Sequence, residues 1–244
     1  MIPSKISQNV FLGDFSLISQ DIGNGWFGAA GRVMNLVVFT SPVSKTVSLL
    51  KESGYFSHQT NTCFLCLDPD FDVNRLSPDD IDLLSSFESH NAKPLDELLN
   101  VAKQRHNPRF SVPVITRDWK SSISTTSLFI QSLSQAGKNV YIIADCSLHN
   151  MATILALSYT IFATGAQLRD AVQHMGSVSR QLGQLSEEII RDYGSYSLLS
   201  QLRQQAIGMR HAESVSSQKR ELETTQLSSL DLSDSRLKRK RDLD

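Results

Sequence analysis

Short apolar runs alternate with amphipathic segments along most of this chain. The runs are bounded by Gly, Pro, Asp and Ser, which is typical of buried strands between turns. We predict strands at Val10–Leu12, Val33–Phe39, Cys63–Leu67, Phe110–Ile115 and Val140–Ile143. Helical periodicity predicts helices at Thr125–Leu133, Met151–Phe162, Ala166–Met175 and Leu185–Arg191. This alternation indicates an α/β protein, with a central mixed sheet of about five strands flanked by helices on both faces.

A polar segment at about residues 68–108 interrupts the alternation. It is rich in Asp, Asn, Ser and Pro and contains two candidate amphipathic helices, Asp79–Phe87 and Leu95–Gln104. We interpret it as an insertion with its own helices and a candidate partner-binding region, because elaborated loops often carry binding functions.

Composition narrows the class of protein. The chain has 244 residues, 40% of them hydrophobic, and a formal net charge of −1, so it can bury one sizeable core. Near-neutral charge argues against nucleic acid as a partner. Met1–Lys5 lacks the apolar core of a signal peptide, and the longest apolar run, Met151–Ala163, is shorter than the ~20 residues of a membrane span. We therefore expect an intracellular protein, in nucleus and cytoplasm, with no membrane partner.

Three cysteines form no complete disulfide set, which fits a reducing compartment. Cys63 and Cys66 have metal-type spacing, but no second Cys or His pair matches them, so a core role is favoured over a zinc site. We predict no metal and no cofactor.

The most informative segment is Val140–Ile154, where a buried strand runs into a short loop and then a long apolar helix. Such units place backbone N–H groups and a helix N-terminus around phosphate. The segment resembles the signature loop of dual-specificity protein phosphatases, whose pattern is His-Cys-x5-Arg. Aligned on Ala152-Thr153-Ile154, the cysteine position holds Ala144 and the arginine position holds Asn150.

The resemblance extends over roughly residues 4–200. Lys5–Asp14 is similar to the family's Ile-x-x-x-Leu-Phe/Tyr-Leu-Gly opening, Val33–Val37 to its Val-Leu-Asn strand, and Gly165–Val172 to its Gly-x-Ser-x-x-Glu-Ala helix start. We interpret the chain as a catalytically inactive, STYX-like pseudophosphatase of this class. The resemblance implies a dual-specificity/tyrosine phosphatase-like fold.

Each replacement removes part of the implied chemistry. Ala144 offers no thiolate, and Asn150 replaces a bidentate guanidinium by a neutral amide. Ser147 stands at a loop glycine, and Met151 at a serine that assists the leaving thiolate. Asp145 places a carboxylate where a dianionic phosphate would bind, and therefore repels it. The degenerate loop comprises Ile143, Ala144, Asp145, Cys146, Ser147, Leu148, His149, Asn150 and Met151.

Other residues of this region have two interpretations each. Cys146 is a nucleophile only in a register that needs arginine at Ala152, and otherwise a small buried residue. His149 is a donor to a partner or a satisfied or exposed histidine. Val112–Asp118 resembles the family's Ile-Pro-Val-x-Asp segment, so Asp118 is a vestigial general-acid candidate or a capping aspartate.

From about His211 the composition shifts to Ser, Thr, Gln, Glu and Lys without aromatic residues, which predicts a disordered tail over 211–244. The tail contains a basic cluster that resembles a nuclear-import signal, and the alternative is a solvated charge run. Its members are Arg236, Lys238, Arg239, Lys240 and Arg241.

Three functions remain open at the level of sequence. The first is a non-catalytic module that binds a kinase, a phosphatase, a phosphatase substrate or a degradation adaptor. The second is a residual cysteine-dependent phosphatase that uses Cys146. The third is an unrelated α/β binding domain.

Overall fold

The computed structural model describes residues 3–18, 35–57, 62–105, 109–145 and 150–211. The chain divides into two compact units, Met1–Arg203 and Gln204–Asp244. The second unit is helical over its described residues, 204–211.

The first unit is an α/β structure built on a six-stranded mixed sheet. The strands in chain order are β1 (Ser4–Ser7), β2 (Val10–Asp14), β3 (Asn35–Thr40), β4 (Thr62–Leu67), β5 (Ile115–Thr116) and β6 (Val140–Ala144). Their order across the sheet is β1-β2-β6-β3-β4-β5, in which only β1 runs antiparallel to its neighbour. The predicted fold class is confirmed, with six strands where about five were expected.

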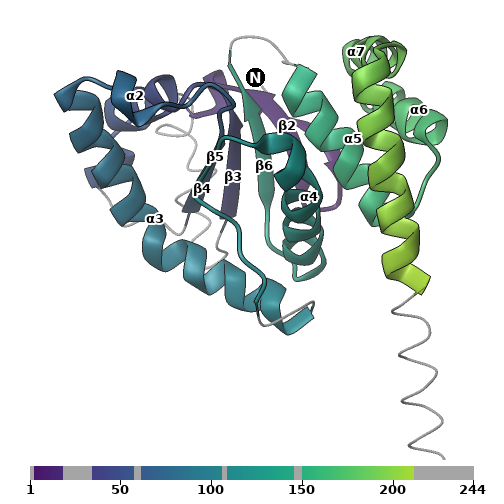
Figure 1. Ribbon diagram of the computed structural model, residues 1–244, viewed down its shortest axis with the longest axis horizontal. Coiled ribbons are helices and arrows are strands. Elements are labelled where there is room, and N and C mark those ends of the chain that lie inside the picture. Colours follow the sequence, from purple (N-terminus) through teal and green to yellow (C-terminus); the bar gives the residue numbers. More distant parts are fainter. Residues whose placement is uncertain (1–2, 19–34, 58–61, 106–108, 146–149, 212–244) are drawn as a thin grey trace, which may run out of the picture. The chain divides into compact units, whose positions relative to one another are not determined.

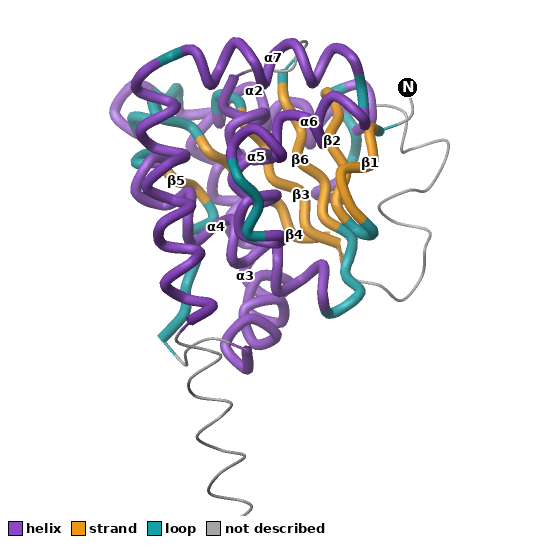
Figure 2. Tube along the Cα trace, turned by 90° about the vertical axis from the view of Figure 1, so that its right-hand side faces the viewer, coloured by secondary structure: helices purple, strands orange, loops and turns teal. Residues whose placement is uncertain are grey.

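The helices connect and cover this sheet. They are α2 (Val43–Glu52), α3 (Pro78–Arg105), α4 (Trp119–Gln135), α5 (Asn150–Thr164), α6 (Leu168–Val178) and α7 (Arg180–Arg191), and residues 193–203 are also helical. Short 3-10 helices lie at Tyr55–Ser57 and Val73–Arg75. Helices α2 and α3 lie on one face of the sheet, and α4 and α5 lie on the other (Figure 1). In the view turned by 90°, the strands lie side by side and α5 lies in front of the sheet (Figure 2).

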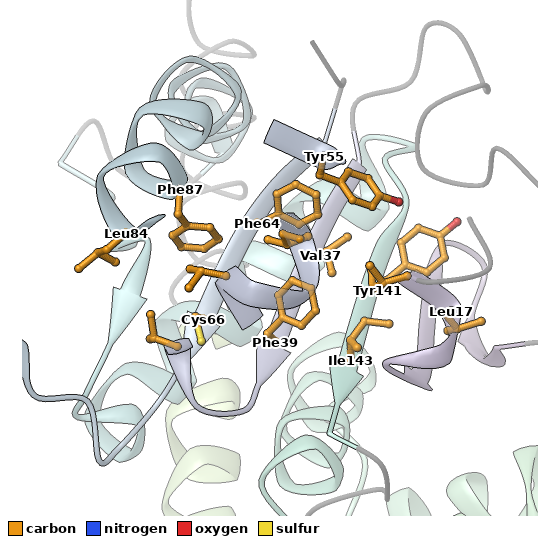
Figure 3. Packing of buried hydrophobic residues seen from close by; sticks show 14 residues of the cluster. Leu17, Val37, Phe39, Tyr55, Phe64, Cys66, Leu84, Phe87, Tyr141 and Ile143 are labelled. Atoms are coloured by element: carbon orange, nitrogen blue, oxygen red, sulfur yellow. The ribbon is translucent and has the colours of Figure 1, made fainter. Parts of the chain in front are cut away.

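Buried side chains explain the central strands. Every residue of β3, β4 and β6 is buried, as expected of parallel strands covered on both faces. On the α2 and α3 side, Val37, Phe39, Phe64 and Ile143 pack with Phe87 in one cluster (Figure 3). The Phe39 and Phe64 ring centroids are 6.1 Å apart, which is within the range of favourable aromatic pairs.

Several elements differ from their predictions. Strand β1 and helix α2 were not predicted. The expected strand Phe110–Ile115 shares only Ile115 with β5, which is Ile115–Thr116. The two expected helices of the 68–108 segment are one continuous helix, α3, with Pro94 inside it. Helix α3 buries Leu84, Phe87 and Leu98 and is the crossover between β4 and β5, so the segment contributes to the core of the sheet.

Two glycines end helices on the opposite face. Gly137, with φ of 75°, follows α4, and Gly165, with φ of 71°, follows α5. Both lie in the left-handed region, which glycine adopts without the steric cost of a Cβ atom. They turn the chain sharply into β6 and toward α6.

Candidate functional site

The candidate site lies where the parallel strands end. Strands β2, β6, β3, β4 and β5 are parallel, so their carboxyl ends share one edge of the sheet. Adjacent strands β3 and β6 are followed by helices on opposite faces, α2 and α5. Such a switch point in strand order is where open α/β sheets generally hold their ligands.

Ala144, at the cysteine position of the resemblance, is the last residue of β6 and is fully buried. In the register of the sheet it pairs with Asp14 of β2 on one side and with Thr40 of β3 on the other. The Thr40 hydroxyl donates a hydrogen bond to the carbonyl oxygen of Ile143 at 3.4 Å, which joins the ends of β3 and β6. A methyl group therefore stands at the centre of the edge, between a carboxylate and a hydroxyl.

Asp145 follows Ala144 directly, and its carboxylate is part of an ion pair. Its Oδ2 atom accepts a hydrogen bond from Lys45 Nζ at 2.5 Å, and the two form an ion pair. Lys45 lies in the first turn of α2, so this pair joins the end of β6 to the helix that follows β3. The side chain of Asp145 is 12% exposed and that of Lys45 is 59% exposed.

Asp68, at the end of β4, occupies the start of α2. Its Oδ2 atom accepts a hydrogen bond from the Val43 N–H at 2.8 Å, and its Oδ1 atom accepts one from the Asp70 N–H at 3.0 Å. The residue before Val43 is Pro42, whose side chain cannot cap the helix. A carboxylate from the neighbouring strand therefore stabilises the positive end of α2.

A small polar network links α2 to the ends of β3 and β4. The Ser41 and Thr46 hydroxyls are 2.8 Å apart, and the Cys66 thiol donates to the Ser41 carbonyl oxygen at 3.2 Å. Burial raises the pKa of the Cys66 thiol to about 12. Burial also raises the pKa of the Cys63 thiol. Both cysteines are therefore protonated core residues, in agreement with the interpretation that favoured a core role over zinc binding.

Asp14 is the last residue of β2 at the same edge of the sheet. Its Oδ1 atom accepts hydrogen bonds from the Ser16 N–H at 2.9 Å and the Ser16 hydroxyl at 2.5 Å. Asp14, Asp145 and Asp68 thus lie at the carboxyl ends of β2, β6 and β4, and the ammonium group of Lys45 pairs with Asp145.

The vestigial general-acid candidate, Asp118, is the N-cap of α4. Its Oδ1 atom accepts a hydrogen bond from the Ser121 N–H at 3.3 Å. Hydrogen bonding to Ser121 holds the pKa of the Asp118 carboxyl below its usual range, whereas a general acid must be protonated at the working pH. Asp118 follows β5, three strand positions from β6, or ~14 Å at the usual strand spacing. The capping interpretation is confirmed.

The remaining loop positions are only partly described. Asn150 is the exposed first residue of α5 and Met151 is half-buried beside it. Cys146, Ser147, Leu148 and His149 lie outside the described residues, as does the basic cluster Arg236–Arg241. Sequence reasoning missed Lys45 and Asp68. A lysine within the first turn after a buried strand, and an aspartate directly after the next strand, are the signals that could have found them.

Two further findings concern cofactors and membranes. Within the described ranges, no group of three or more His, Cys, Asp or Glu side chains could hold a metal ion. No single described helix is long and apolar enough to cross a membrane, and α5 with α6 meets the requirement only as a pair bent by 115°.

Comparison of the chain with protein-family models, with curated proteins and with solved structures gives no match. No family is thereby identified. The resemblance to dual-specificity phosphatases consequently rests on the residues quoted above. The contacts at the carboxyl ends of the parallel strands do not depend on that resemblance.

Proposed function

We propose that this chain is a pseudophosphatase of the dual-specificity class, which acts as a protein-interaction module in phosphorylation-dependent signalling. Its partner would be a kinase, a phosphatase, a phosphatase substrate or a degradation adaptor. The basic cluster Arg236–Arg241 would direct it to the nucleus, and the rest of the population would be cytoplasmic.

The Lys45–Asp145 ion pair is the observation that carries this proposal. An active site of this class needs an empty, positive cradle after the central strand. Here the residue after that strand is a largely buried carboxylate paired with an ammonium group of the protein itself. Ala144, directly before it, has no group that could attack phosphorus. Binding of phosphate would require the dianion to approach the Asp145 carboxylate.

The succession of β6 and α5 supports the link to phosphatases. Strand β6 lies between β2 and β3 in the parallel part of the sheet, and α5 begins at Asn150, six residues after β6 ends at Ala144. A buried strand followed within a few residues by an apolar helix is the local order on which the phosphatase signature depends. Eleven of the fifteen residues of α5 are buried, so the helix is anchored in the core.

The first test is hydrolysis of an aryl phosphate. The purified chain should release no product above a blank, because it lacks both the thiolate and the guanidinium group. Hydrolysis that disappears in the Cys146→Ser variant would instead identify a residual enzyme. Hydrolysis that survives this substitution would refute both interpretations of the loop.

The second test restores the site. A quadruple variant with Ala144→Cys, Asn150→Arg, Asp145→Ala and Ser147→Gly should hydrolyse the aryl phosphate measurably, since backbone N–H groups and the start of α5 supply most of the cradle. Activity should be partial, because Asp118 caps α4 and Met151 has no hydroxyl. The matched control keeps Ala144 and carries the other three changes, so it should bind inorganic phosphate without turnover. A folded quadruple variant that neither binds phosphate nor turns over substrate would favour an unrelated α/β binding domain.

A further inference from the structure

Two serines of this chain stand directly before a proline. Ser41-Pro42 follows β3 and precedes α2, and Ser77-Pro78 lies where α3 begins. One class of protein kinases transfers phosphate to a serine or threonine only where proline is the next residue. Both dipeptides meet that requirement in the sequence, so only the fold distinguishes them.

Ser41 is held inside the protein. It is 5% exposed, and its hydroxyl lies 2.8 Å from the hydroxyl of Thr46 in α2. Its carbonyl oxygen accepts a hydrogen bond from the Cys66 thiol. Val43, two residues further on, is 1% exposed. A kinase could therefore reach Ser41 only after the start of α2 had left the core.

Ser77 lies on the surface, and so do Pro78 and Asp79 after it. Leu76, before it, has an extended backbone with φ of −77° and ψ of 143°, and kinases bind their substrates as extended chain. The first buried residue of α3 is Leu84, six positions after Pro78. The first turn of α3 can therefore open into the cleft of a kinase without moving a core side chain.

The contacts of the Ser77 side chain are easily released. Its hydroxyl donates a hydrogen bond to Asp80 Oδ2 at 2.8 Å and accepts one from the Asp80 N–H at 3.2 Å. The same carboxylate oxygen accepts a bond from the Ser77 N–H at 3.4 Å, so the two residues cap each other. These three hydrogen bonds are exposed, and water replaces exposed hydrogen bonds at little cost.

We propose that Ser77 is a phosphorylation site for a proline-directed protein kinase and that Ser41 is not. The kinase transfers the terminal phosphoryl group of MgATP to the Ser77 hydroxyl. The bond between Ser77 Oγ and phosphorus forms, the bond between phosphorus and the bridging oxygen of ADP breaks, and the hydroxyl proton goes to the catalytic base of the kinase. The site lies on a different element from the degenerate loop, so it does not depend on the class to which the chain belongs.

Phosphorylation changes the cap of α3. The phosphate ester oxygen has no proton to donate to Asp80, and the new dianion repels the carboxylates of Asp79 and Asp80 in the first turn. Backbone N–H groups at the start of a helix attract phosphate. The phosphate therefore displaces the Asp80 carboxylate and accepts the Asp80 N–H itself, and α3 keeps its first turn.

The test incubates the full chain with MgATP and a purified proline-directed kinase and locates the phosphate by tandem mass spectrometry. Ser77 should be modified and Ser41 should not. Ser77→Ala should abolish incorporation, and Pro78→Ala, which keeps the hydroxyl, should slow it by about tenfold or more. Ser41→Ala is the matched control and should leave the rate unchanged. Phosphate on Ser41, incorporation that persists in Ser77→Ala, or an unmodified wild-type chain would overturn the proposal.

NMR of the phosphorylated chain tests the new cap. The Asp80 amide proton should shift downfield, because a phosphate dianion is a stronger acceptor than a hydroxyl. The amide of Asn100, an exposed residue of the same helix, is the control and should not move. An Asp80 amide that moves upfield or exchanges faster with solvent would contradict the exchange of caps and would show that phosphate opens the first turn.

Discussion

At the scale of single residues, Asn91 shows how α3 is attached to the sheet. It is fully buried, and its Oδ1 atom accepts a hydrogen bond from the Phe64 N–H at 2.5 Å. Its Nδ2 group donates to the Phe87 carbonyl oxygen at 2.7 Å. Strand β5 pairs with β4 only at Cys66 and Leu67, so an amide side chain takes the place of a strand beside Phe64.

Replacement of Asn91 by alanine should therefore lower the free energy of unfolding by about 2 kcal/mol, since it leaves the buried Phe64 N–H without its acceptor. Asn100, an exposed residue of the same helix, is the matched control, and Asn100→Ala should change the stability by less than about 0.5 kcal/mol. Urea denaturation of both variants measures the difference. Equal stabilities would show that the Asn91 contacts contribute nothing net.

The residues of the site also show which contacts can be predicted from the sequence. Ala144 and Asn150 were found because a short motif compares positions that are close in the chain. Lys45 and Asp145 are separated by 100 residues, and Asp68 caps a helix that begins 25 residues earlier. Contacts of this kind depend on the order of strands in the sheet, which the local pattern does not specify.

At the scale of elements, α6 and α7 form a tight helical pair built on two glycines. A Cβ atom added at Gly183 would lie 2.8 Å from the Cα atom of Gly176, which is closer than real contacts allow. A Cβ atom added at Gly176 would lie 3.7 Å from the Cα atom of Gly183, which is an ordinary contact. The two positions therefore differ in their tolerance of an added methyl group, although they face each other.

Gly183→Ala should destabilise the protein by about 1–3 kcal/mol, because the backbones of α6 and α7 must separate. Gly176→Ala should be neutral or stabilising by up to about 1 kcal/mol, because alanine favours the helix over glycine. Thermal unfolding followed by circular dichroism compares the two variants. A stable Gly183→Ala protein would mean that the helices separate at no cost.

The elements also explain which predictions failed. Two separate helices were predicted in this segment, whereas α3 is continuous and contains Pro94, a residue that lacks a backbone N–H and normally breaks a helix. Burial of Leu84, Phe87, Leu95 and Leu98 against the rest of the protein holds it in one piece. Strand β1 was missed because its sequence, Ser-Lys-Ile-Ser, has only Ile6 buried. Long apolar runs such as β6 and α5 were predicted well, since burial on all sides leaves a continuous apolar pattern.

At the scale of the whole molecule, the proposal of nuclear import concerns the basic cluster and not the folded first unit. If the cluster directs nuclear import, replacement of Lys238, Arg239, Lys240 and Arg241 by alanine should move a fluorescent fusion out of the nucleus. The melting temperature should stay the same, because these residues lie outside the first unit. Replacement of four exposed cations of the first unit, Lys51, Lys93, Arg169 and Arg180, removes the same positive charge and is the control. An unchanged nuclear signal in the cluster variant would indicate a solvated charge run.

The position of β6 in the sheet has a consequence for the synthesis of the chain. Strand β6 lies between β2 and β3, yet it is the last strand to leave the ribosome. At usual rates of translation, roughly ten seconds pass between completion of β2 and completion of β6. During that time β2 and β3 lack their shared neighbour, and unpaired apolar strand edges promote aggregation. We therefore expect the nascent chain to be most prone to aggregation before residues 140–144 are made.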